Sequence, residues 1–159
     1  GFRLKPFLKG GPQERELRAG TENIPGIIGM AKAFELANKH QKERQSYIEK
    51  LKISFTKKLR NEFPGLKVNG LEKEYSLYSV LNVSFPLHDI GSMLPFSLDL
   101  NGISVSSGSA CASGANDYSH VLKALDAVNE RPAVRFSFSH LNMDEELEKT
   151  LKALKKIMA

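Results

Sequence analysis

The chain has 159 residues, 41% of them hydrophobic and 26% charged, which is the composition of a single globular domain. Its net charge of +5 does not indicate a nucleic-acid partner, because lysines alternate with glutamates as on a solvated helix face and no basic run is interleaved with aromatic residues. The single cysteine excludes an internal disulfide and no apolar run is long enough to cross a bilayer, so we expect a reducing compartment, the cytoplasm, and no membrane partner.

The first part of the chain predicts a polar turn followed by a long helix. Residues 10–23 are polar and contain several glycines, Asn23 suits an N-cap, and Pro25 suits the first helical turn. Apolar residues then recur at helical spacing on both sides of a polar stretch, as Ile27, Met30, Phe34, Ile48, Leu51, Phe55 and Leu59. The pattern stops at Phe63-Pro64-Gly65. We therefore predict one helix from about 24 to 62, with room for a bend in its polar middle.

The second part predicts short strands that alternate with shorter helices. The expected strands are 66–70, 78–85, 103–105 and 133–138. Asp89 is the candidate cap of a helix that reaches Leu100, a second helix is expected at 118–128, and Asn142 with Glu145 resembles a capping box before a final helix. An apolar stripe marks that helix: Leu147, Leu151, Leu154 and Met158. The pattern predicts an α+β fold, with a small, mainly antiparallel sheet of three or four strands covered by helices.

The only cysteine, Cys111, lies in the run Ser106-Ser107-Gly108-Ser109-Ala110-Cys111-Ala112-Ser113-Gly114. Small polar residues of this kind predict a surface loop. A buried core cysteine beside a Ser/Gly turn is the alternative, since free cysteine is usually buried. Nothing between 106 and 114 offers apolar cover, however, and the thiolate is the nucleophile of sulfur chemistry. Cys111 is therefore the first candidate catalytic residue.

Two further polar residues adjoin predicted elements. Thr21 precedes the long helix, whose N-terminal N–H groups suit a phosphate, although an ordinary polar loop also explains it. Arg135 lies mid-strand, where alternation alone would turn it toward solvent. The histidines share no metal-ligand spacing, and a chain with one cysteine has no zinc set, so no metal site is expected.

Three segments in order resemble the cysteine desulfurases, PLP-dependent enzymes of the class V aminotransferase family, in their group with a long catalytic loop. They are Gly10-Gly11-Pro12-Gln13-Glu14-Arg15-Glu16-Leu17-Arg18-Ala19-Gly20-Thr21-Glu22-Asn23, the cysteine run 106–114, and Ala133-Val134-Arg135-Phe136-Ser137-Phe138. The resemblance covers nearly the whole chain. It implies that residues 1–159 are the C-terminal small domain of a fold-type I PLP-dependent transferase.

The resemblance implies a role for each candidate. Cys111 would attack the sulfur of PLP-activated L-cysteine, leaving L-alanine and a Cys111 persulfide, whose sulfur would pass to an acceptor such as an iron–sulfur scaffold or a thiolation protein. Arg135 would bind the substrate carboxylate. Thr21 would reach across a homodimer interface to the PLP phosphate of the neighbouring subunit. His140 stands where many relatives carry an arginine, and no role follows for it.

The family's Schiff-base lysine, in a Ser/Thr-x-His-Lys context, has no counterpart here, nor do its stacking histidine and pyridinium aspartate. The chain also opens without an initiator methionine. We therefore expect the C-terminal part of an enzyme, inactive when alone. Two alternatives stay open: a PLP-free module for dimerisation or sulfur relay, and a selenocysteine lyase.

Overall fold

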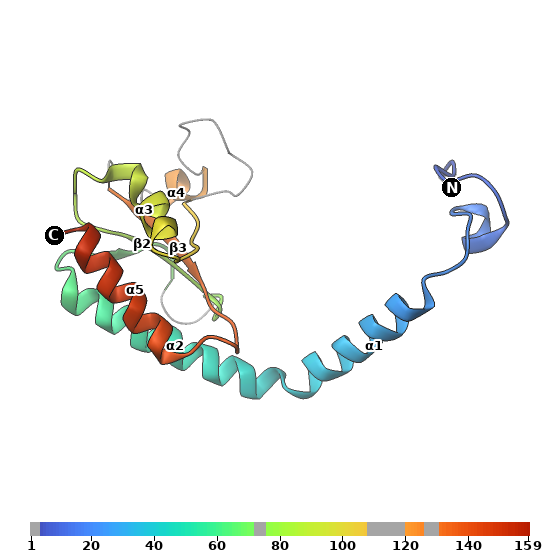
Figure 1. The fold of residues 1–159 in the computed structure, drawn as a ribbon, viewed down its shortest axis with the longest axis horizontal. Coiled ribbons are helices and arrows are strands. Elements are labelled where there is room, and N and C mark those ends of the chain that lie inside the picture. The colour runs from blue at the N-terminus through green and yellow to red at the C-terminus, as the bar shows by residue number, and fades with distance from the viewer. Residues whose placement is uncertain (1–3, 72–75, 108–119, 126–130) are drawn as a thin grey trace. The chain divides into compact units, whose positions relative to one another are not determined.

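The structure is a computed structural model that describes residues 4–71, 76–107, 120–125 and 131–159 (Figure 1). The chain divides into two units, residues 1–41 and 42–159. Only the second unit contains a sheet and a hydrophobic core among the residues described.

The first unit consists of a short 3-10 turn, η1 (Gln13–Glu16), and helix α1 (Ile24–Lys39). The prediction that Asn23 caps this helix is confirmed, because its Oδ1 accepts a hydrogen bond from the Gly26 N–H at 3.1 Å. Every residue of α1 is exposed, and the Phe34 side chain is 75% exposed. Within this unit the helix is therefore held by its backbone bonds and its cap rather than by burial.

The predicted helix from about 24 to 62, with room for a bend in its polar middle, is confirmed in its outer bounds, but one residue in that middle divides it into two helices. Helix α1 ends at Lys39, helix α2 spans Gln41–Glu62, and His40 between them has φ −103° and ψ 8°, outside the helical region. The surrounding polar stretch, residues 38–46, has no buried apolar side chain. Helical order in proteins depends mainly on packing of an apolar face, so the polar stretch lacks the packing that would favour a continuous helix.

The second unit is built on a three-stranded antiparallel sheet in the order β1-β2-β3, which confirms the predicted α+β class. Its strands are β1 (Lys67–Val68), β2 (Val80–Ser84) and β3 (Ala133–Ser137). Leu81 pairs with Phe136 and Val83 with Val134, so the apolar residues of both strands share one face. All four are buried.

The predicted strand at 103–105 is wrong. The Ile103 N–H bonds to the Leu98 carbonyl at 3.0 Å, which ties this segment to the end of the preceding helix. The residue after this segment, Ser106, forms an isolated antiparallel bridge with Arg135.

Among the residues that the structure describes, four helices accompany the sheet: α2, α3 (Leu94–Leu100), α4 (His120–Ala124) and α5 (Asp144–Ile157). A 3-10 turn, η2 (Gly91–Met93), precedes α3, so the N-cap position of α3 belongs to Met93 and not to Asp89 as predicted. Pro95 fits the start of α3 because the first turn needs no N–H from it. Helix α4 lies within the predicted span 118–128, of which 118–119 and 126–128 are outside the described residues.

The capping of α5 is shifted by one residue from the prediction. Glu146, not Glu145, reaches back, and its Oε2 accepts from the Met143 N–H at 3.1 Å and from Asn142 Nδ2 at 3.0 Å. These two bonds lower the pKa of Glu146, because both favour the ionised carboxylate.

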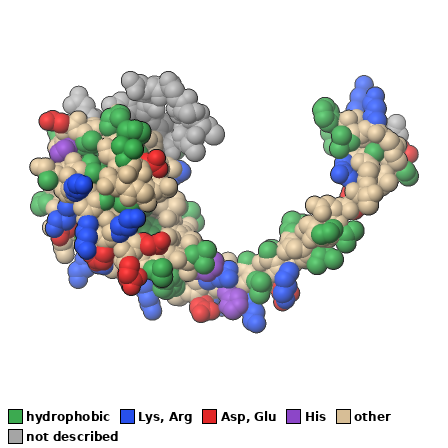
Figure 2. Space-filling model, viewed as in Figure 1, with side chains coloured by type: hydrophobic (Ala, Val, Ile, Leu, Met, Phe, Trp, Pro, Cys, Tyr) green, Lys and Arg blue, Asp and Glu red, His purple; other side chains and the backbone are tan. Residues whose placement is uncertain are grey.

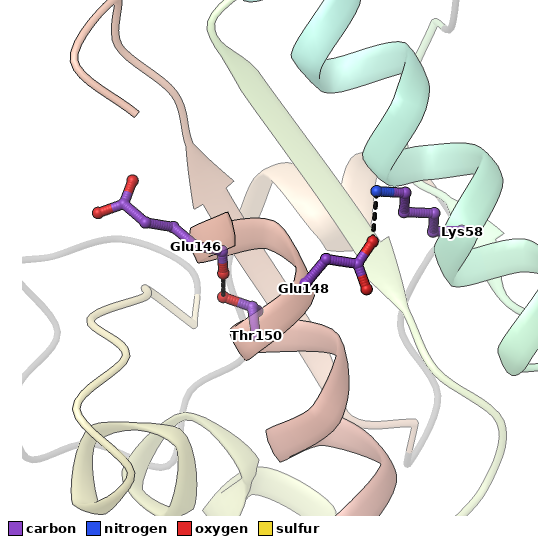
Figure 3. A network of polar contacts seen from close by, with 4 residues as sticks. All are labelled: Lys58, Glu146, Glu148 and Thr150. Atoms are coloured by element: carbon purple, nitrogen blue, oxygen red, sulfur yellow. Dashed lines mark hydrogen bonds and ion pairs between the residues drawn. The ribbon is translucent and has the colours of Figure 1, made fainter. Parts of the chain in front are cut away.

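The core lies between the inner face of the sheet and the helices. It includes Ile48, Leu51, Phe55, Leu59, Leu94, Leu98, Leu147, Leu151 and Leu154. The Phe55 ring packs edge-on against Phe136 with centroids 5.1 Å apart. Helices α2 and α5 lie side by side, joined by the ion pair of Lys58 with Glu148 (Figure 3) and by that of Lys155 with Glu62. One sheet face is thus committed to packing, and the other is available for polar groups.

The surface is mixed in charge. On the face seen in Figure 2, basic and acidic side chains are interspersed over the second unit, in agreement with the alternation in the sequence. Among the helices that the structure describes, none is long and apolar enough to cross a membrane.

Candidate functional site

Arg135 lies in the middle of β3, on the outer face of the sheet. Its neighbours Val134 and Phe136 are buried on the inner face, and Arg135 itself is partly buried. On β2 it pairs with Asn82. The Phe85 N–H bonds to the Pro132 carbonyl and the Phe138 N–H to the Ser79 carbonyl, both at 2.8 Å, which sets the alternation of the ladder. By that alternation Asn82 and Arg135 form a non-hydrogen-bonded pair, the kind whose side chains lie closer together.

The backbone of Arg135 is hydrogen-bonded to Ser106, the first residue of the cysteine run. The Arg135 N–H donates to the Ser106 carbonyl at 2.7 Å, and the Ser106 N–H donates to the Arg135 carbonyl at 3.2 Å. Cys111 lies outside the residues that the structure describes. Ser106, the first residue of the cysteine run, is therefore held beside Arg135, the candidate ligand of the substrate carboxylate. The sequence alone did not indicate this proximity.

The guanidinium of Arg135 has no hydrogen-bond or ion-pair partner among the described residues. Arg131 is the opposite case, because its Nε donates to the Phe85 carbonyl at 2.7 Å and its Nη2 to the Gly65 carbonyl. Arg131 thus joins the ends of strands, a structural role, whereas no described residue occupies the planar fork of Arg135, whose geometry suits a carboxylate.

An amide network lies next to Arg135 and was missed by the sequence reasoning. Asn69 Nδ2 donates to Asn82 Oδ1 at 2.7 Å and to Ser84 Oγ at 2.9 Å, while Ser84 Oγ donates to Asn69 Oδ1 at 3.2 Å. Asparagine is disfavoured in strands, so the presence of Asn82 inside the run Val80–Ser84 was the sequence signal for a polar site here.

Thr21 lies in the first unit, whereas Arg135 lies in the second. Thr21 is exposed, and its carbonyl accepts from Arg18 Nη1 at 3.0 Å. The expectation that the helix N-terminus would offer N–H groups to a phosphate is not met. Asn23 takes the Gly26 N–H, the Glu22 carbonyl takes that of Ile24, and Pro25 has none. The exposed Thr21 hydroxyl is a donor that could serve a phosphate here.

The shifted pKa values lie away from this outer face. Desolvation lowers the pKa of Lys52 on α2, whose Nζ donates to the Leu77 carbonyl at 2.9 Å. A hydrogen bond from Lys58 lowers the pKa of Glu148 on α5. Both helices pack on the inner face, so these shifts belong to the scaffold. Within the described ranges no group of three or more metal-ligating side chains comes together.

Comparison with known proteins places this arrangement in a family. The family described as Aminotransferase class-V matches residues 8–150. The chain belongs to the class-V aminotransferase family. A cysteine desulfurase from Gluconacetobacter diazotrophicus is 38% identical to this family member over 161 residues, and a cysteine desulfurase IscS from Clostridium botulinum (strain Hall) is 37% identical over 161 residues.

Solved structures agree with this placement. A NifS-like protein matches with a TM-score of 0.75 and 35% identity, and a NifS-like protein from Rickettsia africae with a TM-score of 0.73 and 29% identity. These matches cover 99% and 98% of the chain, and the two desulfurases above cover 100% and 99%. The class-V chain spans 40% of the length of each of these four relatives. The recognition of the family and of the fold is therefore confirmed.

Proposed function

We propose that residues 1–159 are the C-terminal domain of a PLP-dependent cysteine desulfurase, in which Arg135 binds the substrate carboxylate and Cys111 accepts the sulfur. The observation that carries the proposal is the pair of backbone hydrogen bonds between Ser106 and Arg135. It joins the root of the cysteine run to an arginine whose guanidinium has no partner among the described residues.

The number of residues between Ser106 and Cys111 supports the proposed roles of Arg135 in binding the substrate and of Cys111 in accepting the sulfur. Five residue steps separate Ser106 from Cys111, and an extended chain spans at most about 3.6 Å per residue, or roughly 18 Å in total. A substrate held by Arg135 would therefore lie within reach of the thiol. The same length would let the sulfur be presented to a second protein.

The proposed reaction transfers one sulfur atom. The Cys111 thiolate attacks the thiol sulfur of L-cysteine, a new S–S bond forms, and the Cβ–S bond of the substrate breaks. The electron pair of the broken bond stays with the substrate carbon, which takes up a proton, so the products are L-alanine and the Cys111 persulfide. Arg135 holds the carboxylate in a two-point contact and so aligns the substrate sulfur with the thiolate.

PLP, when bound, would act as the electron sink for the substrate carbon. The Thr21 hydroxyl fits its phosphate as a hydrogen-bond donor, and we place that contact in a homodimer, on the cofactor of the partner subunit. A lysine outside this chain would anchor the cofactor. We propose a cytoplasmic enzyme, where reducing conditions keep Cys111 as a thiol, with an iron–sulfur scaffold or a thiolation protein as its sulfur acceptor.

The test uses the full-length enzyme. Incubation with L-cysteine should add one sulfur, removable by reductant, to the peptide that contains Cys111, as measured by mass spectrometry. Cys111→Ser should abolish sulfur transfer to an acceptor while PLP remains bound. Sulfur transfer by the Cys111→Ser enzyme, or turnover of the wild-type enzyme with an unmodified peptide, would exclude the proposal.

A further inference from the structure

We propose that Asn82 is a second ligand of the substrate carboxylate, donating from its side-chain amide next to the fork of Arg135. This inference rests on the proposed function, because it takes the ligand of Arg135 to be the carboxylate of L-cysteine. It adds a residue that determines how firmly, and in which orientation, that carboxylate is held.

The first step is the position of Asn82. It pairs with Arg135 across β2 and β3 in a non-hydrogen-bonded pair, where the two Cα atoms are about 4.5 Å apart and both side chains project from the same face. Both residues are partly buried. A ligand that contacts the guanidinium from this face can therefore also reach the Asn82 amide.

The second step is the orientation of the amide. Asn69 Nδ2 faces Asn82 and also donates to Ser84 Oγ at 2.9 Å, while Asn69 Oδ1 accepts from the same hydroxyl. Asn69 Nδ2 requires an acceptor, and it donates to Asn82 Oδ1 at 2.7 Å. Ser84 is only 2% exposed, so this network is anchored in a buried hydroxyl. The oxygen of Asn82 is committed to Asn69, and its Nδ2 remains as the outward donor.

The third step is the lack of a carboxylate among the strand residues of this face. Asn82 Nδ2 and the Arg135 guanidinium have no acceptor among the described residues. The strand residues that share the face are Lys67, Val80, Ser84, Ala133 and Ser137, and none of them is acidic. Two adjacent donor groups, one of them charged, suit an anion with several lone pairs. A carboxylate offers about four lone-pair sites, enough for the arginine fork and one amide bond.

The decisive variant is Asn82→Asp in the full-length enzyme. Aspartate has the same shape and still accepts from Asn69, so the network and the fold are kept, but its second oxygen replaces the amide donor and repels a carboxylate. We expect the KM for L-cysteine to rise about 100-fold in Asn82→Asp and about tenfold in Asn82→Ala. The Ki of cysteamine, which is L-cysteine without its carboxylate, should not rise in either variant.

Two comparisons complete the experiment. Asn101→Ala removes an amide that, among the described residues, donates to the Ser97 carbonyl at the end of α3, and it should leave the KM unchanged. Arg135→Lys tests the proposed function separately and should raise the KM for L-cysteine. If Arg135→Lys raises the KM and both Asn82 variants leave it within twofold of wild type, Asn82 is not a ligand and the proposed function stands.

The remaining outcomes are equally decisive. A parallel rise in the KM for L-cysteine and the Ki of cysteamine would show that Asn82 acts only through the structure, which overturns the inference. An unchanged KM in Arg135→Lys would overturn the proposed role of Arg135, and with it the inference. Thermal unfolding of each variant identifies a loss of fold, and Asn82→Asp is the variant designed to avoid it.

Discussion

The two units of this chain carry the same kind of sequence pattern and use it differently. Apolar residues at helical spacing mark both α1 and α2. Phe55 of α2 is 1% exposed and packs against two other rings, whereas Phe34 of α1 is 75% exposed. Periodicity therefore identifies a helix, but it does not reveal whether the apolar face finds a partner within the same chain.

The difference has an energetic consequence. Residues 42–159 bury a continuous core across α2, α3, α5 and the sheet, so their helices gain stability from packing. Residues 4–41 have no buried hydrophobic side chain, so α1 depends on local backbone bonds and its cap. The following predictions use matched substitutions in the two units of this chain.

The largest contrast is expected between two phenylalanines. Phe55→Ala should lower the free energy of unfolding of residues 42–159 by about 3–5 kcal/mol, because it leaves a cavity among Phe136 and Phe138. Phe34→Ala should change it by less than about 0.5 kcal/mol, because the ring is already in solvent. Urea denaturation followed by circular dichroism measures both. A similar loss in the two variants would contradict the separation of the units.

Two arginines provide the next contrast. Arg131→Ala removes hydrogen bonds to the carbonyls of Phe85 and Gly65 and should lower the free energy of unfolding by about 1.5–3 kcal/mol. Arg18→Ala removes bonds only to the exposed carbonyls of Gly20 and Thr21, so the same urea titration should be unaffected. Equal effects would mean that the loop at Arg18 is coupled to the core.

The cap of α1 should have a purely local effect. Asn23→Ala removes the hydrogen bond to the Gly26 N–H and should destabilise the helix by about 1 kcal/mol. Hydrogen exchange should become faster at amides of α1 and stay unchanged in β2 and β3. Faster exchange in the strands would show that α1 supports the sheet.

The smallest effect concerns pH. Hydrogen bonds, from Asn142 and Met143 to Glu146 and from Lys58 to Glu148, lower the pKa of both carboxyls below the ordinary 4.5. The ionised carboxylates therefore stabilise the folded state above that value, and this contribution is lost as the pH falls through the lowered pKa values. The thermal midpoint of residues 42–159 should fall less steeply below pH 4.5 in Glu146→Gln/Glu148→Gln than in wild type. An unchanged slope would exclude these two groups as its source.

Local chemistry in the sequence predicted much of the fold. The cap at Asn23, the stop at Phe63 and the alternation in β2 and β3 each depend on neighbouring residues, and each is found in the structure. The error at residues 103–105 arose because a specific hydrogen bond, rather than the type of side chain, decides the local form. Residues 103–105 have strand-forming side chains, yet the end of α3 holds Ile103 through Leu98.

The candidate site divides in the same way. The sequence by itself determined which residue types carry the chemistry, a single cysteine among small residues and an arginine within a strand. The folded chain was needed to bring Ser106 to the backbone of Arg135 and to pair Asn82 with Arg135 across β2 and β3. The physical reason is register: burying Leu81 and Val83 together with Phe136 and Val134 fixes the pairing of β2 with β3, and a slip of one residue would turn every side chain to the other face.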